Sequence, residues 1–204
     1  MLFEDRYLTI SKPSQGIFRD KGSKFISYAY PITPETEVKE MINILKTEHS
    51  RARHFCWALR LSQDRNVFRL NDDGEPAGTA GRPILNCLLS ADLTNVLVVV
   101  VRYFGGTLLG VPGLINAYKT ATMEALAVAN RIERTINDRY SISFPYLQMN
   151  GVMKVVKEEQ ITVHFQNFNE HCELVVDIRK SNLNQILSRF DHLDEVKTNY
   201  LSTL

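Results

Sequence analysis

The sequence lacks the features that attach a chain to a membrane or export it. No apolar run approaches the roughly 18 residues that cross a bilayer. The first residues include acidic Glu4 and Asp5 and no long apolar segment, so we expect no signal peptide. A cytoplasmic protein without membrane contacts is the expectation.

Cysteine is also scarce. Cys56, Cys87 and Cys172 are odd in number and far apart, which favours reduced thiols over a disulfide framework. Neither a Cys-x-x-Cys nor a His-x-x-x-His spacing occurs. We therefore predict no metal site and no cofactor.

Neither sign of charge predominates, because the 204-residue chain carries a net charge of only +1. Residues 1–136 hold 17 basic and 14 acidic residues, whereas residues 137–204 hold 7 and 9. The modest basic excess in residues 1–136 is too small to count as a polybasic footprint for nucleic acid. Any nucleic-acid binding must therefore come from local clustering.

Two glycine-rich polar loops, residues 72–83 and 102–113, stand out against this background. Between them, Val96 to Val101 is an apolar run typical of a buried strand. Glycine costs backbone entropy, so a cluster of glycines indicates unusual dihedrals or close backbone approach. Two such loops around one strand predict a site.

Several sequence words, taken in order, resemble the signature of the IMPACT/YigZ family of small translation-associated proteins. The matching words are Ser23 to Phe25, His54 with Cys56, Asp72 to Gly81, Arg102 to Gly106 and Leu109 to Leu114. One departure is Asn116, where family members often carry arginine. The resemblance implies an N-terminal domain like ribosomal protein S-five domain 2, here residues 1–134, and a ferredoxin-like C-terminal domain, residues 138–204.

Periodicity along residues 1–134 predicts an α+β sandwich. Two or three strands are expected before residue 31, and a strand from His54 to Leu61 is expected to alternate its faces. An amphipathic helix of roughly 12–15 residues follows Thr33 and Pro34. A central strand spans Asn95 to Tyr103, and helices begin near Thr79 and at Pro112 or Gly113.

The tail from residue 138 predicts the order β-α-β-β-α-β, which is the ferredoxin-like split motif. Its expected strands and helices are Tyr140 to Phe144, Leu147 to Glu159 with an interruption at Gly151, Gln160 to Phe165, Cys172 to Ile178, Leu183 to Phe190 and Val196 to Leu201. The polar stretch from Asn130 to Asp138 is the expected boundary between the two domains.

The loop after the central strand is the first candidate site. Arg102 and Phe104 leave the strand on one side. Gly105, Gly106 and the following helix N-terminus would suit a phosphate or carboxylate. Neither a Walker A motif nor a Rossmann fingerprint is present. A tight strand-to-helix crossover without a ligand is the alternative.

The acidic loop has Asp72, Asp73 and Glu75 within four residues. Their carboxylates could ligate magnesium or calcium, contact a partner, or cap helices and pair with Arg82 and Arg102. The last, structural role is favoured.

Two further positions are weighed in the same way. His54 and Cys56 share a strand face, but an i, i+2 spacing is too wide for direct proton transfer, so we assign no catalytic residue. Lys24, with Arg19 and Lys21 before it and Phe25 after it, fits either phosphate and base contacts or a solvated hairpin. The predicted ligand or nucleic-acid contacts are Lys24, His54, Asp72, Asp73, Glu75, Gly78, Thr79, Arg82, Arg102, Tyr103, Phe104, Gly105, Gly106, Gly110 and Gly113.

The functional prediction is a non-enzymatic binder of RNA, the ribosome or a translation-related protein, with a role in regulating translation. The family resemblance supplies the translation link, and no DNA sequence specificity is expected. Two alternatives stay open: a peptidase-like hydrolase that uses the loop of Asp72, Asp73 and Glu75, and a phosphate-metabolite binder at Gly105 and Gly106.

Overall fold

The computed structural model describes residues 5–33, 35–62, 65–169 and 171–204. They divide into two units, one of residues 8–134 and one that joins residues 5–7 to residues 135–204. The chain thus passes between the units twice, near residue 7 and near residue 134. The domain limits 1–134 and 138–204 stay a prediction. No helix in the described part of the chain is long and apolar enough to cross a membrane.

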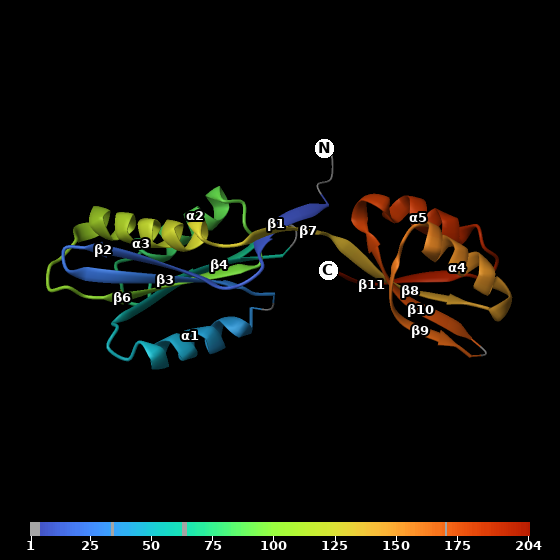
Figure 1. Cartoon of the computed structure of the whole chain (residues 1–204), viewed down its shortest axis with the longest axis horizontal. Helices are drawn as coiled ribbons and strands as arrows, with labels where there is room; N and C mark the ends of the chain where they lie inside the picture. The colour runs from blue at the N-terminus through green and yellow to red at the C-terminus, as the bar shows by residue number, and fades with distance from the viewer. Residues whose placement is uncertain (1–4, 34, 63–64, 170) are drawn as a thin grey trace. The chain divides into compact units, whose positions relative to one another are not determined.

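The larger unit is built on a five-stranded sheet in the order β2-β3-β6-β4-β5, with every adjacent pair antiparallel. Helix α1 covers one face, and α2 and α3 cover the other (Figure 1). Its elements are β2 (Ser14–Asp20), β3 (Ser23–Pro31), α1 (Glu37–Glu48), β4 (His54–Leu61), β5 (Val67–Asn71), α2 (Gly81–Ser90), β6 (Val96–Tyr103) and α3 (Gly110–Ala127).

Strand β6 lies at the centre of this sheet because it has apolar residues on both faces. Val96, Val98 and Val100 pack under α2 and α3. Leu97 and Val99 pack with the residues of α1. The predicted cover on both faces is confirmed, and so is the alternation of β4. An unbroken apolar strand fits a sheet layered between helices.

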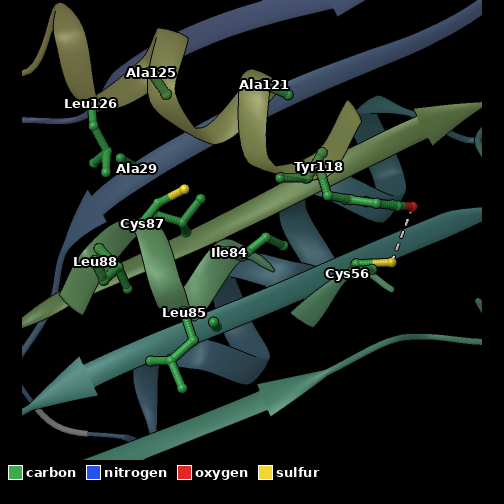
Figure 2. Close-up of a cluster of buried hydrophobic side chains, with 14 of the residues drawn as sticks. Ala29, Cys56, Ile84, Leu85, Cys87, Leu88, Tyr118, Ala121, Ala125 and Leu126 are labelled. Atoms are coloured by element: carbon green, nitrogen blue, oxygen red, sulfur yellow. Dashed lines mark hydrogen bonds between the residues drawn. The ribbon is translucent and has the colours of Figure 1, made fainter. Parts of the chain in front are cut away.

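The core under α2 and α3 is drawn in Figure 2. Alanines of α3, among them Ala121 and Ala125, bring that helix close to the sheet, and Ile84, Leu85 and Leu88 of α2 fill the space beside it. The predicted small-residue stripe of α3 therefore has the packing role expected of it.

The smaller unit has the predicted β-α-β-β-α-β order, and its antiparallel sheet runs β11-β8-β10-β9. Helices α4 and α5 lie on one side of it (Figure 1). Its elements are β8 (Asn137–Phe144), the 3-10 turn η1 (Tyr146–Gln148), α4 (Met149–Glu158), β9 (Thr162–Phe168), β10 (Cys172–Arg179), the 3-10 turn η2 (Lys180–Asn182), α5 (Leu183–Asp191) and β11 (Lys197–Thr203). The α+β class and the ferredoxin-like motif are confirmed.

Two strands, β5 and β7 (Arg131–Thr135), were not predicted. Strand β7 occupies the polar stretch expected to be the domain boundary. It pairs with β1 (Arg6–Ile10), one of the two or three strands expected before residue 31. Strand β5 lies at the edge of the larger sheet and exposes Phe68 and Arg69, so its sequence lacks the apolar alternation of a buried strand.

The starts of the helices differ from prediction by a few residues. Helix α1 begins at Glu37, later than expected, and Pro34 lies outside the described residues. Helix α3 begins at Gly110, before Pro112. Proline is tolerated there because first-turn N–H groups have no partner within the helix. Gly151 does not interrupt α4, which is continuous across it.

Candidate functional site

The acidic loop between β5 and α2 is held by its own carboxylates. The Asp72 carboxylate accepts hydrogen bonds from the backbone N–H groups of Gly78 (2.9 Å), Ala80 (3.0 Å) and Gly81 (2.8 Å). It therefore caps the start of α2, where orphan N–H groups need acceptors. The Asp73 carboxylate accepts from the Phe55 N–H at 2.6 Å and ties the loop to β4.

Glu75 turns inward and meets Arg102 of β6. The Arg102 Nη1 donates to Glu75 Oε1 at 2.5 Å, and the exposed fractions of the two side chains are 7% and 4%. The Tyr118 hydroxyl of α3 donates to the same carboxylate oxygen at 2.7 Å. One buried carboxylate thus connects the acidic loop, the central strand and helix α3. Removing one partner of such a pair leaves an uncompensated buried charge.

Cys56 of β4 extends this buried network. Its Sγ lies 3.3 Å from the Tyr118 hydroxyl, a contact drawn in Figure 2, and 3.0 Å from the Asp72 carbonyl oxygen. Burial raises the pKa of the Cys56 thiol far above its usual range, and burial likewise raises the pKa of Tyr118. A thiol kept protonated is a poor nucleophile, so the network stabilises the fold rather than providing a reactive group.

His54 and Cys56 share one face of β4, as predicted, and both contact the acidic loop. The His54 ring donates from Nδ1 to the Asp73 carbonyl oxygen at 2.8 Å, which fixes the tautomer with the proton on Nδ1. The His54 ring and the Cys56 thiol do not bond to each other; each reaches a different carbonyl oxygen of the loop, that of Asp73 and that of Asp72. The pair positions the loop.

The Arg102 guanidinium is also held by aromatic rings. Its Cζ lies 5.4 Å from the ring centroid of Phe25 and 5.6 Å from that of Phe104, distances at which a cation and an aromatic face attract. Its Nε is buried and has no hydrogen-bond partner among the described residues. Arg102 was predicted to contact an external anion, but its side chain is buried and already paired. The anion that Arg102 binds is therefore a neighbouring group of the protein, the Glu75 carboxylate.

The glycine loop after β6 packs against the β2–β3 turn. The Gly105 N–H donates to Ser23 Oγ at 3.1 Å, and a Cβ on Gly105 would lie 1.9 Å from the carbonyl carbon of Gly22. Gly106 has φ +87° and open space around it. Close backbone approach thus explains the first glycine and a positive φ explains the second, while Phe104 stays 46% exposed beside them.

A row of basic side chains crosses the same end of the sheet on the face that α1 covers. The register sets Arg19 of β2 opposite Lys24 of β3, and Lys24 opposite Tyr103 of β6. Opposite residues share a face, so Arg19, Lys24 and Tyr103 lie on one side of the sheet. Arg53 directly precedes β4, and its N–H donates to the Arg102 carbonyl, which brings its backbone to the end of β6. Three strand spacings separate the ends of the row by about 14 Å. We call Arg19, Lys24, Tyr103 and Arg53 the basic row.

Two more cations flank the basic row, Lys21 in the β2–β3 turn and Arg51 before β4, and both are exposed. None of the five cations pairs with a carboxylate in the part of the chain that the structure describes. The nearest acidic residues in the sequence are Asp20 and Glu48, and neither forms an ion pair among the described residues. Like charges set opposite each other on neighbouring strands destabilise a sheet, so stability does not explain this row.

Tyr103 is fixed at the centre of the basic row by His49 from the end of α1. The His49 Nδ1 lies 2.8 Å from the Tyr103 hydroxyl, and its Nε2 lies 2.7 Å from the Tyr28 hydroxyl. One imidazole therefore bridges two tyrosines of neighbouring strands, and the ring of Tyr103 has little freedom to move.

The predicted site residues fall into four groups. Lys24 and Tyr103 belong to the basic row, and Phe104, Gly105 and Gly106 form the loop after β6. The residues in and around the acidic loop are His54, Asp72, Asp73, Glu75 and Arg102. A fourth group lies at the two helix starts. Its members are Gly78, Thr79 and Arg82 at α2, and Gly110 and Gly113 at α3.

Sequence reasoning did not find Arg53, Arg51 or Tyr118. The signal for Tyr118 was a tyrosine on an apolar helix face, since a buried hydroxyl needs a partner. Arg53 had no local signal, because its place at the end of β6 depends on the bond of its N–H to the Arg102 carbonyl. Asn116, where the family pattern has arginine, lies exposed on α3.

The acidic loop does not gather a metal-ligand set. Among the described residues, no three histidine, cysteine, aspartate or glutamate side chains are placed to hold one ion. The carboxylate oxygens instead accept hydrogen bonds from donors within the protein, as shown for Asp72, Asp73 and Glu75. The three cysteines are free and buried.

Comparisons with known proteins identify the family of the chain. Residues 21–126 match the model of the Impact N-terminal domain. An IMPACT family member of Haemophilus influenzae is 33% identical over 168 residues, which is 80% of each chain. YigZ of Escherichia coli is 33% identical over 150 residues, covering 72% of this chain and 74% of its own.

Solved structures give the same picture. A crystal structure described as that of a hypothetical protein is 25% identical, with a TM-score of 0.75, over 98% of this chain and 99% of its own. The structure of Yih1, described as a two-domain translational regulator, is 32% identical over 62% of this chain and 48% of its own, with a TM-score of 0.36. By the family model and the extent of these matches, the chain belongs to the IMPACT family.

Proposed function

We propose that this chain is a non-enzymatic, cytoplasmic binding protein that contacts RNA or the RNA surface of the ribosome and so takes part in regulating translation. Family membership supports the translation role, since the related Yih1 is described as a translational regulator. The observation that carries the RNA contact is the basic row, in which Arg19, Lys24 and Arg53 cross the sheet without a carboxylate partner among the described residues.

The chemistry of the basic row fits a phosphate backbone. Cations that neutralise phosphates release counterions, and this provides affinity without base-specific contacts. Side chains spaced about 14 Å from end to end reach more than one phosphate. A translation factor with an acidic surface would meet the same cations, but regularly spaced phosphates fit a row better than scattered carboxylates do.

The internal contacts of the acidic loop favour its structural role over the hydrolase alternative. Asp72 caps α2, Asp73 binds β4, and Glu75 is buried against Arg102. A general acid or base must reach a substrate proton, and these carboxylates face the protein's own donors. The metabolite alternative loses Arg102 as its cation for the same reason.

The test is fluorescence anisotropy of a labelled, structured RNA with the full chain across a salt series. Wild type should bind, and its affinity should fall steeply with salt. Lys24→Ala/Arg53→Ala should bind more weakly and reduce the slope of log K against log salt by about 1.4 to 1.8, because each lost phosphate contact removes roughly 0.7 to 0.9.

The matched control is Lys12→Ala/Lys39→Ala, which removes the same charge from exposed positions outside the basic row. It should keep most of the wild-type slope. Flat anisotropy for wild type at every salt concentration would sink direct RNA binding and point to a protein partner. Equal losses in the two double variants would mean that general charge, not the basic row, attracts RNA.

A further inference from the structure

Helices α2 and α3 lie on the face of the larger sheet opposite α1 (Figure 1). A groove runs between these two helices. Its volume is about 750 Å³, within the range of roughly 300–1,000 Å³ typical of binding clefts. Its floor includes Pro83 and Cys87 of α2, and Met123 of α3 stands 52% exposed beside it. The basic row lies on the other face of the sheet, so the groove is a separate surface.

The charged residues that line the groove are all positive. They are Arg82 at the start of α2, Lys119 in the middle of α3 and Arg131 of β7. No carboxylate lines the groove among the residues that the structure describes. Arg131 donates to the Leu126 carbonyl, and none of the three forms an ion pair with a described residue. An apolar floor with a cationic rim complements a ligand that is apolar on one side and acidic on the other.

The length of the groove and the number of its cations decide what kind of ligand fits. Arg82 and Ser90 lie near opposite ends of α2, and both line the groove. The groove therefore follows the ten-residue helix, a length of about 15 Å. A fatty acid or other amphiphile with one anionic head would neutralise one cation and leave two. A segment that carries several carboxylates beside apolar side chains neutralises all three.

We propose that the groove between α2 and α3 is the docking site for an acidic amphipathic peptide segment of a partner protein. Its apolar side chains lie on Pro83, Cys87 and Met123, and its carboxylates pair with Arg82, Lys119 and Arg131. Two packed helices that present an apolar groove recognise such segments as short helices with anchors at i, i+3, i+4 and i+7. The cations fix the orientation and raise the association rate.

The experiment uses the full chain and a labelled amphipathic peptide of about three helical turns, with leucine at the anchor positions and glutamate on both flanks. We expect saturable anisotropy that weakens with salt. Arg82→Glu/Lys119→Glu should weaken binding by about tenfold or more. Both side chains are exposed or on the rim, and the double variant is expected to fold. Lys12→Glu/Lys39→Glu, the same change elsewhere, should bind as wild type does.

Three results would overturn the proposal. A peptide with lysine in place of glutamate that binds equally well would show that charge does not matter. Full binding by the Arg82→Glu/Lys119→Glu variant would place the peptide elsewhere. Displacement of the peptide by decanoate or by structured RNA would assign the groove to a small amphiphile or to the nucleic-acid surface. Loss of RNA binding in the basic-row variant with peptide binding intact would separate the two surfaces.

Discussion

Arg102 and Tyr103 are neighbours on β6, yet the charges around them have opposite environments. Arg102 points to the α3 face, where Glu75 neutralises it in a buried site. Tyr103 points to the α1 face, where Lys24 lies opposite it without a carboxylate partner among the described residues. One residue along the strand separates a satisfied ion pair from an unsatisfied row of cations.

The contrast between paired Arg102 and the unpaired basic row separates charges that stabilise the fold from charges available to a partner. A buried, paired arginine stabilises the position of the loop, and its side chain is only 7% exposed. Cations set opposite each other cost stability, and for this reason the proposed contact with RNA is assigned to them. The glycine-rich loop lies at the same end of the sheet, but its arginine is buried and paired.

Glu75→Ala should have the largest effect of the changes at this end of the sheet. It leaves Arg102 buried without its counter-charge and Tyr118 without an acceptor. We expect a loss of about 3–5 kcal/mol in the free energy of unfolding, measured by urea denaturation of the full chain. Glu35→Ala removes the partner of Arg69 in an exposed pair and should cost less than about 1 kcal/mol. Similar losses for both would contradict the buried role of Glu75.

The two glycines of the loop test its packing next. Gly105→Ala would push a methyl group into the backbone of Gly22, and overpacking of this kind costs about 2–3 kcal/mol. Gly106→Ala meets open space and only strains a positive φ, which costs about 1 kcal/mol. Thermal unfolding of the two variants should rank them in this order. The reverse order would mean that the loop does not pack on the β2–β3 turn.

The pair of Asp5 and Arg179 is intermediate between the two environments. The Arg179 guanidinium donates from Nε to Asp5 Oδ2 at 2.5 Å, and the exposed fractions of the side chains are 37% and 10%. Hydrogen bonds from Arg179 and Ser181 lower the pKa of Asp5 from 3.8 to about 2. Because the folded pKa is below the unfolded one, this stability is present above about pH 4 and is lost as pH falls towards 2.

Asp5→Asn should therefore lower the free energy of unfolding by about 2 kcal/mol at pH 7. The difference from wild type should shrink between about pH 4 and pH 2. Urea denaturation at several pH values measures both. Asp194→Asn, at an exposed position of the same unit, is the control and should follow wild type throughout. A difference that grows towards acid would refute the sign of the pKa shift.

Local patterns in the sequence were enough to predict most of the fold. The valines of β6 and the alternation of β4 predicted strands and faces that the structure confirms. In residues 138–204, hydrophobic periodicity and turn residues predicted the β-α-β-β-α-β order that the structure shows. Strands β5 and β7 were missed because each is only five residues long and exposed along most of its length. Their partner strands, and not an apolar alternation, define them.

The candidate site was predictable only as far as single loops carry information. The motifs around Asp72 and Arg102 lie at the end of the sheet where the basic row also lies, and a site there stays a prediction. The pairing of Glu75 with Arg102 and Tyr118 depends on three elements far apart in sequence. Arg53 reaches the basic row only through the bond of its N–H to the Arg102 carbonyl. Sequence spacing specifies neither, since both require the folded sheet.

Lys24→Ala should give the smallest change in stability, and its sign separates the two environments most sharply. Lys24 faces Arg19 across two strands, so its removal relieves a like-charge contact. We expect the free energy of unfolding to stay within about 0.5 kcal/mol of wild type or to rise slightly, while RNA affinity falls and its salt slope decreases by about 0.7 to 0.9. Lys24→Arg keeps the charge and should keep the affinity. A clear loss of stability in Lys24→Ala would show that the lysine serves the fold, and the contrast between the two sides of β6 would fail. A variant that folds as well as wild type and binds RNA less tightly would show that the exposed side of the strand is shaped for a partner, at a small cost to the sheet.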